Sequence, residues 1–200
     1  MTSKTIKRTK LLDHGVYLLM TQGYHATGVN EIVNAAGVPK GSFYSYFESK
    51  EAYATEVISH YLEPFIQRLT EHLQNPQLGA LAALKCYYAE LIVEAEKNDF
   101  RGGCLLGNLM GEIGDTSERC NQALKSAVGR YQSLLEKALL KAQQEGTVRD
   151  DMLAVNMAKL LVNNWQGALL RMKLEKSVQP LQEFCASLLD DYFVARPSNS

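Results

Sequence analysis

Apolar residues recur at intervals of three and four along most of the chain, which is the spacing of one face of an α-helix. Clear examples are the segments 128–139, 161–172 and 181–192. No stretch alternates apolar and polar residues as cleanly as a half-buried strand would. Residues 77–179 contain no proline that would interrupt a helix. The pattern predicts an all-α protein of about nine helices.

The first 50 residues divide into three shorter helices. The first runs from about Thr5 to Gln22 and is ended by Gly23, and the second has the sequence "VNEIVNAAG". The third starts near Pro39, where the missing N–H of proline costs nothing. A short helix, a glycine-containing turn and another short helix form the helix-turn-helix pattern. We therefore expect a DNA-binding domain over residues 1–50 and a larger helical domain over residues 51–200.

The charge distribution agrees with an anionic partner for the first segment. The net charge of the chain is −1, but residues 1–50 hold six basic and three acidic residues. The other 150 residues hold 15 basic and 19 acidic residues. A basic segment on an acidic body favours binding of an anion there. A fluctuation of a few charges would give the same pattern, so charge alone does not decide.

The third helix is expected to lie in the major groove, with its N-terminal residues at the edges of the bases. Lys40 can donate to guanine O6 and N7, and Ser42 can donate or accept. Gly41 carries no side chain at a place where the backbone must approach DNA. Phe43 either packs on the inner face of this helix with Phe47 or contacts a thymine methyl group.

The residues that follow are expected to bind the sugar-phosphate backbone of DNA. Tyr44 and Tyr46 can present their hydroxyls to phosphates, which orients the protein on the duplex. Ser49 can cap the next helix and leave Lys50 in its first turn. The N–H groups of that turn and the Lys50 ammonium together favour a phosphate.

Residues 5–50 resemble the DNA-binding domain of the TetR family of bacterial transcriptional regulators. The family pattern is a glycine and an aromatic residue after the first helix, then T-T-V-x-D-I-A-x-x-A-G-V, a short helix and Y-x-[YH]-F-x-[SN]-K-[ED]. The chain reads "GYHATGVNEIVNAAGVPKGSFYSYFESKEAY" with the spacing preserved. Gly28 replaces the second threonine, which in the family caps helix two and contacts a phosphate. Either Thr27 supplies this contact, or the backbone N–H groups of Val29 and Asn30 do.

The resemblance also implies what residues 51–200 do. In the family this part is a variable all-α domain that forms a homodimer and often binds a small effector between its helices. The last two long helices usually pack with those of the partner as a four-helix bundle. The apolar stripes at 153–172 and 181–192 agree with such a bundle, although they could also face the chain's own core. A symmetric dimer would read a near-palindromic operator in double-stranded DNA.

Cys104 is a candidate sensor of electrophiles or oxidants. It lies in "DFRGGCLLGNLMGEIGD", where an apolar helix begins. A thiol in a first helical turn near Arg101 is expected to be unusually nucleophilic. The segment resembles a subgroup of TetR-like regulators with the sequence G-C-L-L-G-N-L. Some members respond to such compounds through that cysteine, and the subgroup can carry a lysine near the thiol, at the position of Lys173.

Other readings of these residues remain open. Cys104 is alternatively a small apolar residue that fills space. The other three cysteines are expected to be packing residues: Cys86, Cys120 and Cys185. Tyr88, Asn108 and Trp165 are candidates for lining an effector pocket, although aromatic residues at helical spacing usually belong to a core. Glu112 and Asp115 flank a helix end and are expected to be solvated or to cap it.

No catalytic, metal-binding or cofactor-binding pattern is present in the sequence. The cysteines form no C-x-x-C pair, and no histidine has a second histidine four residues away. No Ser/His/Asp or Cys/His set can be assembled, and there is no glycine-rich phosphate loop. We therefore expect neither an enzyme nor a protein with a cofactor or a metal site.

The apolar segments are too short for a membrane span, and the basic N-terminus lacks the pattern of a signal peptide. The expectation is a cytoplasmic protein with reduced thiols. The preferred function is a homodimeric DNA-binding repressor that a small effector or modification of a reactive cysteine releases from its operator. The alternative is a helical ligand-binding protein or enzyme without DNA binding.

Overall fold

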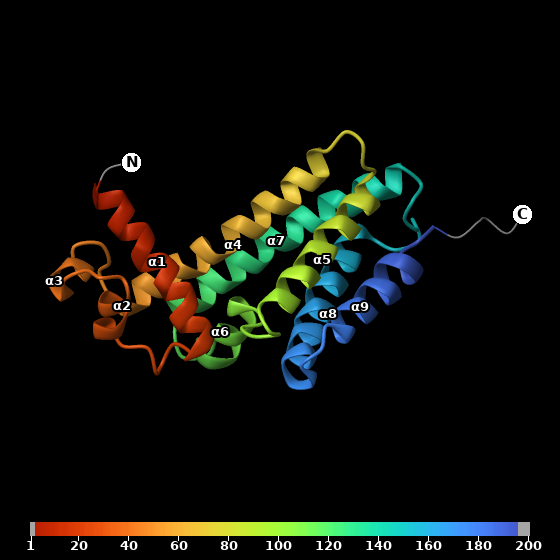
Figure 1. The fold of residues 1–200 in the computed structure, drawn as a ribbon. Helices are drawn as coiled ribbons and strands as arrows, with labels where there is room; N and C mark the ends of the chain where they lie inside the picture. Colours follow the sequence, from red (N-terminus) through yellow and green to blue (C-terminus); the bar gives the residue numbers. More distant parts are fainter. Residues whose placement is uncertain (1–2, 196–200) are drawn as a thin grey trace, which may run out of the picture. The chain divides into compact units, whose positions relative to one another are not determined.

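A computed structural model describes residues 3–195, and this part of the chain is helical apart from turns and one isolated bridge between Val148 and Val194 (Figure 1). The elements are α1 (Ser3–Thr21), α2 (Val29–Ala35), α3 (Lys40–Phe43), α4 (Lys50–Gln74), α5 (Ala80–Lys97), α6 (Leu105–Ile113), α7 (Glu118–Gln144), α8 (Ala154–Glu175), α9 (Gln179–Phe184) and the π-helix η1 (Cys185–Tyr192). The predicted all-α fold is confirmed. No helix in the described part is long and apolar enough to cross a membrane.

The chain divides into two compact units by its internal contacts. The first unit comprises the described residues up to Pro64 together with Cys104–Val128. The second comprises Phe65–Gly103 and the described residues from Gly129 onward. Helices α4 and α7 each contribute residues to both units. A first unit drawn in this way contains α6 as well as α1, α2 and α3, whereas the sequence placed a domain boundary at residue 50.

Helices α1 and α4 pack closely in the first unit because one glycine permits it. The Tyr53 hydroxyl on α4 donates to the Leu11 carbonyl at 2.7 Å, and both residues are fully buried. A Cβ added to Gly15 would overlap that hydroxyl and the Val57 side chain. Gly15 therefore leaves the space through which α4 reaches the backbone of α1.

The helix-turn-helix segment follows the sequence expectation closely. Ile32 and Val33 of α2 are buried, and Gly37 turns the chain with φ +65°. Val38 is buried behind this turn, and Pro39 is the N-cap of α3. Helix α3 is only four residues long, so the side chains that can reach DNA from it are few.

The predicted cap of the following helix is confirmed. The Ser49 hydroxyl accepts the Ala52 N–H at 3.0 Å, and α4 begins at Lys50. A capped start fixes the direction in which α4 leaves the helix-turn-helix segment.

An aromatic cluster forms part of the core of the second unit. The ring centroids of Tyr88, Trp165 and Phe184 lie 4.9–5.1 Å apart, and all three residues are buried. These rings come from α5, α8 and α9. Aromatic pairs at such separations add to the stability that burial of their area provides.

The apolar stripe of α8 is covered within the chain, and the stripe that runs over α9 and η1 is covered in part. Trp165, Met172 and Leu181 are among the buried residues of these stripes. The exposed leucines of α8 lie on another face: Leu170 and Leu174 are 63% and 83% exposed. The stripe of α8 therefore faces the chain's own core, whereas in the 181–192 stripe Cys185 and Leu188 are half-buried and Tyr192 is 39% exposed.

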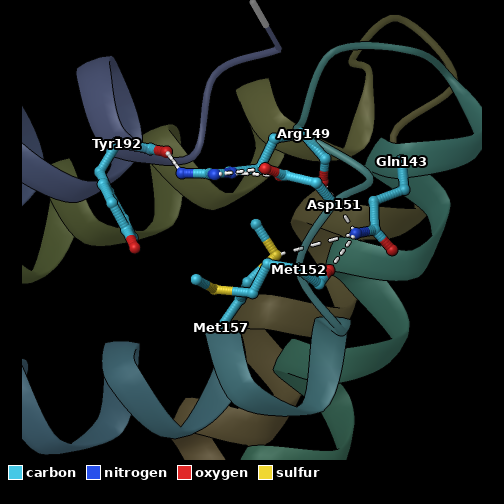
Figure 2. A network of polar contacts seen from close by, with 6 residues as sticks. All are labelled: Gln143, Arg149, Asp151, Met152, Met157 and Tyr192. Carbon is cyan, nitrogen blue, oxygen red and sulfur yellow. Dashed lines mark hydrogen bonds and ion pairs between the residues drawn. The ribbon is translucent and has the colours of Figure 1, made fainter.

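The connection between α7 and α8 is held by two polar side chains (Figure 2). The Gln143 amide donates to the carbonyls of Arg149 and Met152, at 2.8 Å each. The Arg149 guanidinium donates to both carboxylate oxygens of Asp151, at 2.5 and 2.6 Å. It also donates to the Tyr192 carbonyl at 3.4 Å and lies over that ring. These contacts join the end of η1 to the turn that starts α8.

Candidate DNA-binding surface and sensor cysteine

The start of α3 presents the polar residues that were predicted to read bases. Lys40 and Gly41 are exposed, and Ser42 is half-buried. A Cβ at Gly41 would meet nothing within 4 Å. Gly41 is therefore not required by the packing of this chain, and its position is open to another molecule. Base contacts by these three residues remain predictions.

Phe43 requires a correction. Its side chain has no exposed surface, and its ring centroid lies 5.3 Å from those of Phe47 and Tyr53. The contact with a thymine methyl group is therefore excluded in this conformation, and the alternative inner position is the one observed. Phe43 joins α3 to α4 through an aromatic core.

Thr27 is also corrected. It is fully buried, and its hydroxyl donates to the Gly23 carbonyl at 2.6 Å. It caps the end of the turn after α1 and has no surface to offer a phosphate. Gly28 is the N-cap of α2 and has no side chain to contribute. The phosphate contact predicted here rests on the backbone N–H groups of Val29 and Asn30.

The aromatic residues after α3 keep their predicted exposure only in part. Tyr44 is 58% exposed and Tyr46 is half-buried. A phosphate contact by either hydroxyl remains a prediction.

Lys50 has a role inside the first unit. Its ammonium donates to the Tyr24 carbonyl at 2.6 Å and lies 4.2 Å from the centroid of the Tyr24 ring. Partial burial lowers the pKa of Lys50, and the carboxylate of Glu112 opposes this shift. Its predicted contact with a phosphate is untested, and its hydrogen bond to the Tyr24 carbonyl was not predicted.

Replacing Lys40 with alanine is expected to weaken operator binding by about 1–3 kcal/mol and to relax the preference at one base pair. The reason is that an ammonium at a base edge discriminates between bases, whereas one at a phosphate does not. Binding to a series of single-base operator variants measures this. Lys125→Ala removes the same charge from an exposed position of α7 in the same unit. A uniform loss across the series in Lys40→Ala would contradict base reading.

Cys104 is the N-cap of α6 and is half-buried. The loop before it is unusual, because Asp99 and Phe100 have φ +53° and +59° and Gly102 and Gly103 have φ +86° and +75°. Left-handed backbone at two non-glycine residues costs free energy that the rest of the fold must offset. The chain thus reaches Cys104 through a tight, strained turn.

Lys173 lies beside this turn. In the second unit, its Cδ atom is 3.0 Å from the position that a Cβ on Gly103 would take. Gly103 immediately precedes Cys104 in the sequence. A side chain at position 103 would displace the lysine, so the glycine allows the lysine stem to lie across the backbone there. The predicted proximity of Lys173 to the thiol stays a prediction.

The other cysteines differ in accessibility. Burial raises the pKa of the Cys120 thiol, and Cys120 is fully buried. Burial, with the Asp190 charge second, raises the pKa of Cys185 to about 11. Both thiols are therefore poor nucleophiles, as expected of packing residues. Cys86 is exposed, so its assignment as a packing residue is wrong.

Tyr88 and Trp165 are core residues of the second unit. The Tyr88 hydroxyl is buried and has no hydrogen-bond partner among the described residues. Burial raises the pKa of Tyr88, and Tyr87 adds to the shift; the nearby Tyr131 hydroxyl opposes it but donates to Tyr87 at 3.0 Å. An unpartnered buried hydroxyl is uncommon. Asn108 is half-buried on α6, in the first unit.

Glu112 is a residue whose role the sequence did not reveal. Its carboxylate accepts the N–H groups of Tyr24 and His25, at 2.7 and 2.6 Å. The expectation that it would be solvated or capping is wrong. Tyr24 and His25 lie 88 and 87 positions before Glu112 in the sequence, and no local pattern indicates a contact between them. Asp115 is exposed, as expected.

The described residues contain no group of three or more histidine, cysteine or acidic side chains that could hold a metal ion. The functional features are therefore an exposed α3 start, a half-buried thiol at a helix N-cap and a set of hydrogen bonds around the turn after α1. Together with the packing of α1, α2 and α3, they define a DNA-binding protein of the helix-turn-helix class.

The chain belongs to the TetR family of bacterial transcriptional regulators. Residues 11–57 match the family "Bacterial regulatory proteins, tetR family". Residues 80–188 match "Tetracyclin repressor-like, C-terminal domain". The resemblance stated from the sequence is thereby confirmed, and with it a DNA-binding regulator of the repressor type.

Similar proteins cover nearly the whole chain. The HTH-type transcriptional repressor DhaR of Mycobacterium sp. (strain GP1) is 31% identical over 91% of this chain and 90% of its own length. The repressor NemR of Escherichia coli (strain K12) is 31% identical over 90% of each chain. The crystal structure of reduced E. coli NemR superposes with a TM-score of 0.86 at 30% identity, covering 96% of this chain and 98% of that one. All three comparisons are with transcriptional repressors.

Proposed function

We propose that the protein is a homodimeric repressor that leaves its operator when Cys104 is modified by a small electrophile or oxidant. The observation that carries this proposal is the position of Cys104. It is a half-buried N-cap residue, and it follows a turn in which Asp99 and Phe100 are held at positive φ and Gly102 and Gly103 complete the turn. An electrophile or oxidant reacts with the thiolate form of a cysteine.

Modification would add bulk at the residue where the Gly102–Gly103 turn meets α6. A quinone, for example, accepts the Cys104 sulfur on a ring carbon, and the proton of the thiol ends on the reduced ring oxygen. A peroxide would instead transfer one oxygen atom to the thiolate, which becomes a sulfenic acid, and the rest of the peroxide leaves as water or an alcohol. Either product changes the N-cap of α6, so the start of this helix must repack. The modified protein must prefer the conformation that does not bind DNA, because only a difference between two states shifts their populations.

The comparisons support a thiol-based switch. The E. coli NemR structure is named as a reduced form, which distinguishes that form of the relative by its redox state. This chain is 31% identical to NemR. We extend a redox-sensitive or electrophile-sensitive switch to this protein as a proposal.

A reversible ligand is a second candidate effector. The observation that favours it is the Tyr88 hydroxyl, which is buried and unpartnered among the described residues. Trp165 and Phe184 stack around the same ring. A flat molecule with one hydrogen-bonding atom would satisfy that hydroxyl within the aromatic cluster. The predicted contribution of Asn108 to such a site is untested.

The dimer is expected to use the outer face of α8. Leu174→Glu should convert the dimer to a monomer, because a carboxylate without a partner is costly to bury in an apolar contact. Light scattering measures the molar mass. Val93→Glu is the matched control, since Val93 is also exposed but lies on α5. A monomeric wild type that still binds its operator would remove the dimer from the proposal.

Nuclease protection on the DNA around the protein's own gene tests the proposed function. A homodimer should protect a near-palindrome whose half-sites are about 34–36 Å apart, because each recognition helix enters one of two successive major grooves. Adding a quinone should abolish the protection. The proposal fails if no segment is protected, or if protection survives quinone treatment and every small-molecule class tried.

A further inference from the structure

We propose that Glu112 is a positioning residue for DNA binding: its carboxylate ties α6 to the turn after α1 and so fixes the orientation of the helix-turn-helix. This inference rests on the DNA binding of the proposed function but not on the cysteine switch. The donors and acceptors that carry it all belong to the first unit.

The Glu112 carboxylate is the acceptor of two adjacent backbone N–H groups. Tyr24 donates to one oxygen at 2.7 Å and His25 donates to the other at 2.6 Å. Both donors lie in the turn between α1 and α2. Successive backbone N–H groups that converge in a turn form a concave site for an anion, and a carboxylate fills it here. Hydrogen bonds to a charged acceptor are stronger than those to a neutral one.

The same turn is held on its other side by Lys50. The backbone N–H of Tyr24 donates to Glu112, and the backbone carbonyl of Tyr24 accepts from the Lys50 ammonium at 2.6 Å. The backbone of Tyr24 is therefore bound by a carboxylate at its N–H and by an ammonium at its carbonyl. Lys50 is the first residue of α4, so the turn is joined to α6 and to α4 together.

The absence of a side chain at Gly23 leaves room for the Glu112 carboxylate beside the turn. Its φ is +84°, and a Cβ at this position would lie 2.6 Å from one Glu112 oxygen. A side chain there would both strain the backbone and push the carboxylate away. The glycine that ends α1 is therefore also the residue that lets Glu112 approach.

The corner between α6 and α7 makes a second attachment to the DNA-binding segment. The Ser117 hydroxyl donates to Glu51 in the first turn of α4 and accepts the Cys120 N–H at 3.0 Å. Arg119 forms an exposed ion pair with Glu48 at 3.3 Å. The Ser117 contact anchors the start of α4 independently, so loss of Glu112 should loosen the turn after α1 without detaching the corner.

The consequence concerns α2 and α3. The turn held by Glu112 leads directly into α2, and α2 packs against both α1 and α3. Freeing the turn allows α2 and α3 to move together relative to α1. A dimer must place two copies of α3 in two grooves at once. A small rotation of each α3 should therefore weaken specific binding more than non-specific binding, because non-specific affinity depends mainly on charge.

Three substitutions separate geometry from charge. Glu112→Ala removes both acceptors, Glu112→Asp keeps the charge but shortens its reach, and Glu112→Gln keeps one acceptor oxygen. The probes are the DNA segment that the wild type protects from nuclease and an unrelated duplex of equal length. We expect Glu112→Ala and Glu112→Asp to bind the protected segment about tenfold more weakly, with Glu112→Gln between them and the wild type. Affinity for the unrelated duplex should not fall.

Glu118→Gln is the matched control, because Glu118 is exposed in the same unit and, among the described residues, accepts a local hydrogen bond from Gln122. It should bind both duplexes as the wild type does. Thermal unfolding of each variant shows that the chain is folded. Equal changes in affinity for both duplexes would overturn the inference, because they would indicate an effect of charge alone. Wild-type affinity of Glu112→Ala and Glu112→Asp for the protected segment would also overturn it, because Glu112 would then have no role in DNA binding.

Hydrogen exchange gives a readout that does not depend on DNA. The amides of residues 23–36 should exchange faster in Glu112→Ala and Glu112→Asp than in the wild type and in Glu118→Gln. Unchanged exchange there would contradict the positioning role. If the wild type protected no DNA at all, the proposed function would fail, and exchange would still decide whether Glu112 holds the turn.

Discussion

Phe43→Ala is expected to lower the free energy of unfolding by about 3–5 kcal/mol, which is the usual cost of removing a fully buried aromatic ring. The ring has no exposed surface and packs against Phe47 and Tyr53. Its removal leaves a cavity between α3 and α4 that two fixed helices cannot readily close. Chemical denaturation monitored by circular dichroism measures the change.

Tyr44→Ala is the control next along the chain. Tyr44 is 58% exposed, so its loss should change stability by less than about 0.5 kcal/mol. If its hydroxyl binds a phosphate, operator affinity should fall for all sequences alike. If Phe43→Ala had wild-type stability but reduced operator affinity, the result would contradict the buried position of Phe43 and favour its contact with DNA.

Cys104→Ser is expected to keep operator affinity and to lose the whole response to electrophiles. Serine is close to cysteine in size and can also serve as an N-cap, so α6 should start in the same way. Its hydroxyl is not ionised at neutral pH and does not add to a quinone or oxidise. Fluorescence anisotropy of a labelled operator, before and after quinone treatment, measures both properties.

Replacing the other cysteines separates this thiol from its neighbours. Cys120→Ser and Cys185→Ser should respond as the wild type does, because burial raises the pKa of both thiols. Cys86→Ser is the most informative of the three, because Cys86 is exposed and open to reagents. Loss of the response in Cys86→Ser with retention in Cys104→Ser would move the sensor to α5.

The helix-turn-helix was predictable because its signals are local. Gly23 and Gly37 both adopt positive φ, and Ser49 caps α4 through a hydrogen bond three residues away. Such features depend on residues close in sequence, so the motif and its spacing contain them. Ile32 and Val33 are buried for the same reason, since a short amphipathic helix has only one apolar face.

Contacts between distant segments were not predictable. Glu112 looks like an ordinary acidic residue near a helix end, and nothing near it in the sequence announces Tyr24 as its partner. Phe43 could have faced either side of a four-residue helix, and only the approach of Tyr53 from α4 decides that it is buried. Likewise, helical periodicity shows that α8 has an apolar stripe, but not whether α5 and α9 or a second chain covers it.

A single titration tests the central claim, that modification of Cys104 releases the repressor from DNA. The wild type, bound to a labelled operator duplex, is titrated with a quinone. The fraction of DNA bound is read by anisotropy, and modification at each cysteine is read by mass spectrometry in the same samples. We expect DNA release to follow the modified fraction of Cys104 and to be independent of the modified fraction of Cys86. DNA that stays bound after Cys104 is fully modified, or is released while Cys104 is intact, would contradict it.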